Sequence, residues 1–292
     1  AWRNLMRNKS YAAINIIGLS VGIAACTLIF LIIQFETSFD TFHTKKDKIY
    51  RVITAFHNPD GINFSSGVPL PISEGLRLDF PQLKQVAQVM QNDGSHYSIG
   101  NPGKGQQVKK FKEDWAYYVE PQFFQIFDYA WLAGDKKTAL AEPYTVVLSR
   151  DEANKFFGDW HSAVGKVVKY ENKTDLKVTG IIENTPPNTD IPLKLVVSFA
   201  TLRAKGSDYY GNLHDWVSTF GDNSCFIILP DNMSQAQFDQ NLKAFVKKHK
   251  PADYVKDGLQ LQPLKEMHYN TEVNVYGGHP FSKQLLNVIS LI

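Results

Sequence analysis

A run of 26 residues without a charged side chain, between Lys9 and Glu36, constrains this chain more than any other feature. Its most apolar part, Ile14–Ile33, would measure about 30 Å as an α-helix, which matches the hydrocarbon thickness of a bilayer. Residues 1–13 carry three basic side chains and no acidic one, whereas Glu36 and Asp40 follow the run. By the positive-inside rule we predict a transmembrane helix over residues 14–35, a cytoplasmic N-terminus and an extracytoplasmic body.

Three other interpretations of the run are open. A cleaved signal peptide has a shorter apolar stretch of about 7–15 residues and a small-residue cleavage site, which Gln34-Phe35-Glu36 does not resemble. Ile23-Ala24-Ala25-Cys26 resembles the lipobox of a lipoprotein, but the chain stays apolar after Cys26. A buried core helix is the third alternative. The length of the run and the charges on its flanks favour the transmembrane helix.

Small residues recur every four positions within the span, at Gly18, Gly22 and Cys26. Such a row allows the backbones of two membrane helices to approach closely. Glycine is also common in membrane helices in general. Helix packing at these three residues is therefore a hypothesis.

The cytoplasmic segment, residues 1–13, has an amphipathic pattern. Trp2, Leu5 and Met6 fall on one helical face, opposite Arg3 and Arg7. This pattern is typical of a short helix lying on the surface of a membrane.

The C-terminal residues, 282–292, are largely apolar. As a helix, the last eight residues would cover only about 12 Å, too little to cross a bilayer. We predict the start of a truncated second transmembrane helix, with an amphipathic docking helix as the alternative. Because the chain also begins with Ala rather than Met, we expect both ends to be boundaries within a longer protein.

The body between the apolar ends alternates predicted strands and helices, which indicates an α+β fold with a strand-rich insertion in its middle. Strands are predicted at 48–56, 85–91, 115–119, 144–148, 164–170, 175–182, 194–199, 224–229 and 259–264. Helices are predicted at 69–80, after Pro121, from the capping box Ser149/Glu152 to Gly158, and from the capping box Ser234/Gln237 to Pro251. Residues 92–107 are predicted to form an exposed loop or hairpin.

Motifs for chemistry are missing from the sequence. No zinc-protease or GxSxG pattern occurs, and the glycine-rich residues 100–105 fail the P-loop spacing. The eight histidines are interpreted as solvated or capping residues. Cys26, in the membrane, and Cys225, in the extracytoplasmic body, are predicted to lie in different compartments, so they cannot pair. A net charge of +2 argues against nucleic-acid binding. We therefore predict no catalytic, cofactor-binding or metal-binding residue, and no enzymatic activity in this chain.

An ordered series of stretches carries a family resemblance. They are Trp2-Arg3-Asn4-Leu5, Asn8-Lys9, residues 14–24, 38–43, 47–52, 119–128, 138–140, 146–149, 153–158, 164–166 and 178–182. Over residues 1 to about 250 the chain resembles MacB/FtsX-type ABC transporter permeases with a MacB-like periplasmic core domain. The stretch 38–52 is similar to the membrane exit of Bacteroidetes-type members.

The resemblance implies a porter-like periplasmic subdomain at residues 36–129 and 216–281, interrupted by a strand-rich subdomain at 130–215. It implies a multi-pass protein of the bacterial inner membrane that forms a homodimer or a heterodimer with a second permease. It also implies a separate cytoplasmic ABC ATPase that binds the ATP, with a periplasmic adaptor as a further candidate partner. Trp2, Leu5 and Met6 would then contact the ATPase, and Gly18 and Gly22 would lie where membrane helices pack.

The expected function is a permease subunit that transmits ATPase motion to the periplasmic domain for efflux or release of a drug, peptide or lipoprotein. The alternative is a signalling receptor whose periplasmic domain binds a ligand between two membrane spans. A membrane-anchored hydrolase is a third reading, which lacks a recognisable nucleophile or metal site.

Overall fold

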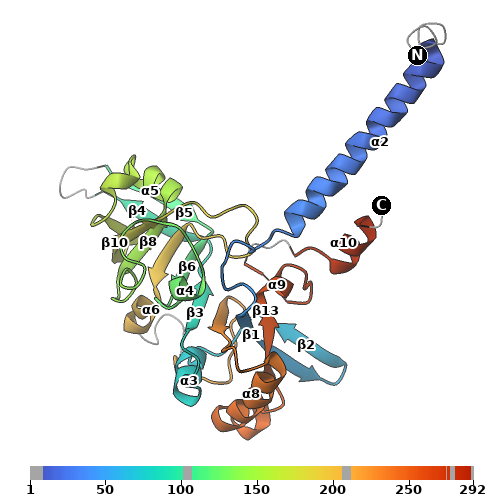
Figure 1. The fold of residues 1–292 in the computed structure, drawn as a ribbon. Coiled ribbons are helices and arrows are strands. Elements are labelled where there is room, and N and C mark those ends of the chain that lie inside the picture. Colours follow the sequence, from blue (N-terminus) through green and yellow to red (C-terminus); the bar gives the residue numbers. More distant parts are fainter. Residues whose placement is uncertain (1–8, 101–106, 206–211, 274, 277–279, 291–292) are drawn as a thin grey trace.

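The computed structural model describes residues 9–100, 107–205, 212–273, 275–276 and 280–290. Its first element, α2 (Lys9–Glu36), is a helix of 28 residues that stands away from the body with none of its side chains buried (Figure 1). Among the described residues it is the one helix long and apolar enough to cross a membrane. Its exposed apolar surface would be unfavourable in water and fits the interior of a bilayer. The predicted helix over residues 14–35 is thus present.

One mixed sheet of 13 strands organises the body, in the order β13-β1-β12-β3-β6-β11-β8-β10-β9-β4-β5, with β2 beside β1 and β7 beside β10. The strands are β1 (Ile49–Asn58), β2 (Gly61–Ser65), β3 (Val86–Gln91), β4 (Ser95–Ile99), β5 (Lys109–Glu113), β6 (Ala116–Val119), β7 (Trp131–Ala133), β8 (Thr145–Ser149), β9 (Val167–Tyr170), β10 (Thr174–Ile182), β11 (Leu195–Ser198), β12 (Asn223–Ile228) and β13 (Gly258–Pro263). The pairs β6–β11 and β8–β10 are parallel, and the other pairs are antiparallel.

Side chains on successive strand residues point to opposite faces of the sheet and so divide the core. Tyr117 and Val147 enter a central cluster that also holds Phe123, whereas their neighbours Tyr118 and Val146 enter a cluster on the other face. A third cluster covers the β1–β12–β13 end. Both faces of β6 and β8 are therefore buried, which explains why these strands form short, largely apolar runs in the sequence.

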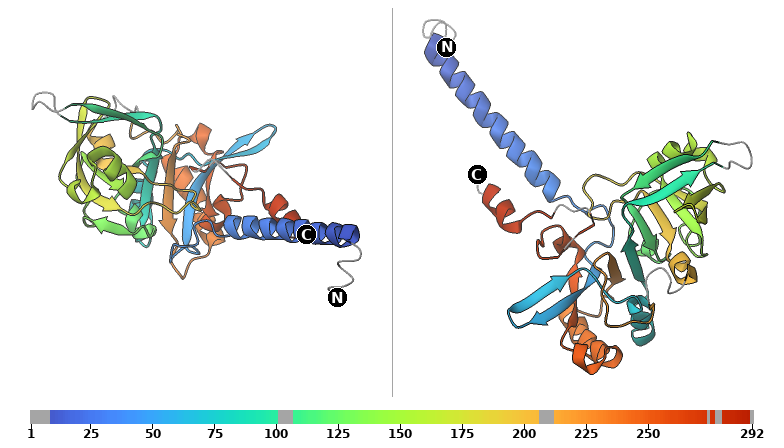
Figure 2. Two further views of the ribbon diagram at one scale, coloured as in Figure 1. Left: turned by 90° about the horizontal axis from the view of Figure 1, so that it is seen from above. Right: turned by 180° about the vertical axis from the view of Figure 1, so that it is seen from behind.

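The helices cover both faces of this sheet. They are α3 (Ile72–Asp79), α4 (Phe123–Ile126), α5 (Arg150–Phe157), α6 (Phe199–Lys205), α8 (Gln235–His249), α9 (Leu264–Met267) and α10 (Lys283–Ile289), with short 3-10 turns η2 (Trp160–Ser162) and η3 (Ala252–Tyr254). The helices α3 and α8 pack at one end of the sheet and α5 and α6 at the other (Figure 1). The last helix, α10, contacts α2 beside the body (Figure 2).

The two predicted capping boxes have different outcomes. Ser234 and Gln237 form both reciprocal bonds at the start of α8. At the start of α5, Ser149 accepts a hydrogen bond from the Glu152 N–H, but the Glu152 carboxylate pairs with Lys155 at 3.3 Å. The capping box predicted at Ser149/Glu152 is therefore only half correct, because the Glu152 carboxylate pairs with Lys155 and not with the backbone N–H of Ser149.

Several elements were missed by the sequence patterns. The strand β5 carries three lysines, and β2 has mostly exposed side chains, so neither shows the apolar alternation of a half-buried strand. The exposed loop or hairpin predicted at 92–107 contains β4, which is mostly buried and pairs with β5 just beyond that range. The division into a porter-like subdomain and an inserted subdomain at residues 130–215 stays a prediction. Strands of the two predicted subdomains share one sheet, as in the pair of β6 with β11.

Candidate functional site at the membrane exit

The chain leaves α2 through residues 37–45, here called the exit segment. Thr37 Oγ1 donates a hydrogen bond to the carbonyl of Ile33 (2.7 Å), and Ser38 Oγ donates to that of Phe35 (2.6 Å). The same two carbonyl oxygens also accept backbone N–H bonds, from Thr37 (2.9 Å) and Ser38 (3.1 Å). The helix therefore ends in an ordered turn that leads directly onto the body.

Asp40 anchors the exit segment to the loop that follows β10. Its backbone N–H donates to the carbonyl of Asn188 (3.0 Å), and its carboxylate accepts hydrogen bonds from Thr189 Oγ1 (2.5 Å) and the Asp190 N–H (3.2 Å). Burial raises the pKa of Asp40 to about 7. The Thr189 hydrogen bond opposes this rise, and the charge of Asp190 adds to it. The anchor therefore contains a carboxyl group that holds its proton near neutral pH.

His268 connects the last residue of α2 to the same loop. Its Nε2 lies 2.7 Å from Glu36 Oε2, its Nδ1 lies 3.0 Å from Asp190 Oδ1, and its ring stacks on Phe39 with centroids 3.5 Å apart. The Tyr269 hydroxyl donates to the carbonyl of Glu36 (2.9 Å). Burial lowers the pKa of His268, but the hydrogen bonds and charges of the two carboxylates outweigh it, so the pKa is raised. This favours the imidazolium form, in which both ring nitrogens donate.

A second anchor joins the exit segment to the end of α4. The Asp128 N–H donates to His43 Nδ1 (3.0 Å), and Asp128 Oδ2 accepts from both the N–H and the hydroxyl of Thr44 (2.7 Å each). Burial lowers the pKa of His43 to about 4, against the charge of Asp128. His43 is therefore a neutral acceptor at physiological pH, packed between Phe42 and Phe127.

Parts of the chain far apart in the sequence thus meet where the membrane helix ends: the exit segment, the loop 188–190, and His268 with Phe281. Phe281 N–H donates to the carbonyl of His268 (2.7 Å), just before α10 begins. We call the set Glu36, Asp40, His43, Asp128, Asp190 and His268 the junction. It holds carboxylates and imidazoles, and its hydrogen bonds join the end of α2 to the body.

The residues singled out from the sequence lie elsewhere. Gly18, Gly22 and Cys26 are exposed on α2, where a Cβ atom on either glycine would meet no atom within 4 Å. Helix packing at these residues stays a prediction. Trp2, Leu5 and Met6 lie outside the described residues.

The interpretation of the histidines as solvated or capping residues is wrong for His43 and His268. Both are almost fully buried, with 1% and 3% of their surface exposed. For His43, the signal in the sequence was the mixture of aromatic and polar residues in 38–43, directly after the span. A search for metal-binding or catalytic motifs does not detect such a segment. Among the described residues, no three His, Cys, Asp or Glu side chains are grouped so as to hold a metal ion.

Comparisons with known proteins agree with this architecture. The family model for the MacB-like periplasmic core domain matches residues 12–245. A domain described as part of a permease protein from Porphyromonas gingivalis is 18% identical with a TM-score of 0.60, covering 76% of this chain and 92% of that one. The periplasmic region of MacB from Actinobacillus actinomycetemcomitans is 16% identical with a TM-score of 0.50, covering 78% and 91%. No curated protein matches the chain.

The fold and the junction define a class of protein, a mixed α/β extracytoplasmic domain carried on a membrane helix. The family match then identifies the chain: it belongs to the family of MacB-like periplasmic core domains. It is a component of a MacB/FtsX-type ABC transporter, and its apolar helix and periplasmic domain fit a protein of the inner membrane.

Proposed function

We propose that this chain belongs to a permease subunit that transmits the motion of a cytoplasmic ATPase to the periplasmic domain. In this proposal α2 moves with the other membrane helices of a multi-pass homodimer or heterodimer. The transported cargo is a drug, peptide or lipoprotein, and a periplasmic adaptor is a further candidate partner. ATP is bound by the separate ATPase subunit, so this chain itself needs no cofactor.

The bridge from Glu36 through His268 to Asp190 carries the proposal. Glu36 is the last residue of α2, and Asp190 lies in the body, so His268 links the two directly. The residues after His268 lead to α10, which contacts α2. A shift of either helix therefore pulls on the loop 188–190, which is held in turn by Asp40.

Hydrogen–deuterium exchange tests this proposal without knowledge of the cargo. The full-length protein is purified from its native membrane with its co-purifying ATPase and placed in lipid nanodiscs, and exchange is measured with and without ATP and vanadate. The variants are His268→Ala and, as a matched control, His57→Ala, whose side chain is exposed on β1. Because nucleotide binds on the cytoplasmic side, an ATP-dependent change in the periplasmic strands reports transmitted motion.

We expect ATP to change exchange in the exit segment and body of the wild type and of His57→Ala. His268→Ala should keep nucleotide-free protection of β1 and β12, which shows that it folds, and should lose most of the ATP response. An equal ATP response in His268→Ala would refute the role of the junction. The lack of any co-purifying ATPase would refute the permease function and favour the receptor.

A further inference from the structure

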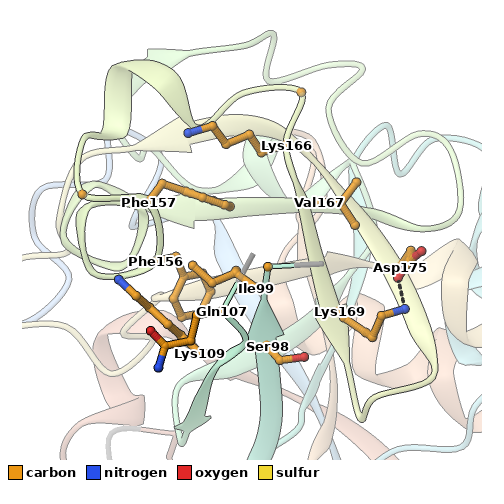
Figure 3. Close-up of a pocket in the computed structure, with 13 residues that line it drawn as sticks. Ser98, Ile99, Gln107, Lys109, Phe156, Phe157, Lys166, Val167, Lys169 and Asp175 are labelled. Carbon is orange, nitrogen blue, oxygen red and sulfur yellow. Dashed lines mark hydrogen bonds and ion pairs between the residues drawn. The ribbon is translucent and has the colours of Figure 1, made fainter. Parts of the chain in front are cut away.

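A cleft of about 850 Å³ opens between α5 and the edge of the sheet where β4 and β9 separate (Figure 3). The two strands pair only at Tyr97–Tyr170 and Ser98–Lys169. Beyond these two pairs β4 and β9 are no longer paired with each other: Ile99 of β4 has no partner on β9, and Val167 of β9 has no partner on β4. The cleft is therefore built into the fold, and its volume is within the range of small-molecule sites, about 300–1,000 Å³.

The inner wall of this cleft is apolar. Phe157, at the end of α5, contributes a half-buried ring, which packs edge-to-face against the buried ring of Phe156 with centroids 6.2 Å apart. Ile99 and Val167 line the other side, and Val167 is 48% exposed. Figure 3 shows Ile99 between the two phenylalanines and Val167. Such a surface gains free energy when a hydrocarbon or aromatic group covers it.

The rim of the cleft is basic. Lys109, Lys166 and Lys169 line it together with one acidic residue, Asp175, so its formal charge is 3 − 1 = +2. Lys169 is paired with Asp175 at 2.5 Å. Lys166 Nζ donates a hydrogen bond to Ser162 Oγ (2.9 Å) and lies 4.9 Å from the centroid of the Phe157 ring. Lys109 forms no ion pair with the residues that the structure describes. Lys109 and Lys166 thus place two positive charges beside the apolar wall, and neither is in an ion pair within the described part of the chain.

We propose that this cleft binds an anionic amphiphile, a ligand with a carboxylate, sulfonate or phosphate group and an apolar body. Lys109 and Lys166 attract the anionic group, and the apolar body covers Ile99, Phe157 and Val167. The charge of the rim selects against cationic ligands, and the apolar wall selects against small inorganic anions. None of these residues belongs to the junction, so the proposal does not rest on force transmission.

The fluorescent probe 8-anilinonaphthalene-1-sulfonate tests this site, with N-phenyl-1-naphthylamine as a matched probe that has the same rings without the sulfonate. The chain is placed in nanodiscs of zwitterionic lipid without ATP, and the signal of empty nanodiscs is subtracted. The variant Lys109→Glu/Lys166→Glu reverses the charge of the rim. The control Lys136→Glu/Lys137→Glu makes the same change at two exposed lysines that do not line the cleft.

We expect saturable binding of the sulfonate probe, weakened at least about tenfold by Lys109→Glu/Lys166→Glu, because like charges facing each other in a site cost several kcal/mol. The control should bind as the wild type does, and the uncharged probe should be insensitive to both changes. Lys109→Gln/Lys166→Gln, which only neutralises the rim, should be intermediate. Unchanged protection of β9 and β10 in hydrogen exchange confirms that each variant is folded.

Competition separates an amphiphile site from a plain anion site. Octanoate should displace the sulfonate probe, whereas inorganic phosphate at the same concentration should not. Equal displacement by phosphate would overturn the proposal, as would sulfonate binding that does not respond to Lys109→Glu/Lys166→Glu. Since no nucleotide or ATPase is present, these outcomes are independent of the permease function.

Discussion

The buried carboxyl group of Asp40 makes the stability of the fold depend on pH. Burial raises its pKa to about 7 from the ordinary 3.8. Between these two values the folded protein holds a proton that the unfolded chain has released, so stability is lost as the pH rises. His268, whose pKa is also raised, changes the stability of the fold in the same direction. His43 acts oppositely: its pKa is lowered to about 4, so its contribution to the stability of the fold increases from about pH 4 to 6.5. The substitution Asp40→Asn separates these contributions, because it resembles the protonated acid and leaves both histidines in place.

The magnitude follows from the two pKa values. Between pH 5 and pH 8, ionisation of Asp40 should remove about 2.5 kcal/mol from the stability of the wild type relative to Asp40→Asn. For a domain of this size, about 2–4 °C of melting temperature corresponds to each kcal/mol. The difference in melting temperature between the two proteins should therefore change by about 5–10 °C across this range.

The assay is thermal unfolding of the chain in nanodiscs, followed by tryptophan fluorescence at several pH values. Asp47→Asn is the matched control, because Asp47 is an exposed carboxylate soon after the exit segment. We expect Asp47→Asn to follow the wild type. A difference between wild type and Asp40→Asn that is constant with pH, or that grows in favour of the wild type at high pH, would refute the reasoning.

Two further predictions concern the core and the membrane helix. Glu120 is buried and accepts hydrogen bonds from Arg77 and Arg203. Because Glu120→Ala leaves both arginines without this carboxylate, it should lower the free energy of unfolding in denaturant by about 3–5 kcal/mol. A decrease below about 1 kcal/mol would show that water replaces the carboxylate. If Gly18 and Gly22 pack helix on helix, replacing both by leucine should weaken association in detergent while the body stays folded. Unchanged chemical crosslinking of that double variant would contradict the packing hypothesis.

Local patterns predicted much of the fold. The capping residues Ser149 and Ser234 mark the starts of α5 and α8, because a cap acts within one helical turn. Strand β12 was recognised as a buried strand because residues 224–229 form a short, largely apolar run, and five of its six residues are buried. The pattern failed at β5, where an edge strand that pairs with β4 carries three lysines and so shows no apolar alternation.

The candidate site was hidden from the sequence for a different reason. Glu36 and His268 are 232 residues apart, and Asp40 and Thr189 are 149 residues apart. A carboxylate and an imidazole at such separations have no spacing that identifies them as partners. Their pKa shifts also depend on burial, which follows from packing and not from the neighbouring residues in the chain.

The sequence by itself predicted a helix that enters a membrane and the side of the membrane on which the body lies. Hydrophobicity and flanking charge act over about 20 contiguous residues, so they can be read without knowledge of the fold. Tertiary structure alone decided what meets at the end of that helix and where the basic cleft opens. The junction and the cleft are both formed by side chains from distant strands and loops, and only the order of strands in the sheet brings these together.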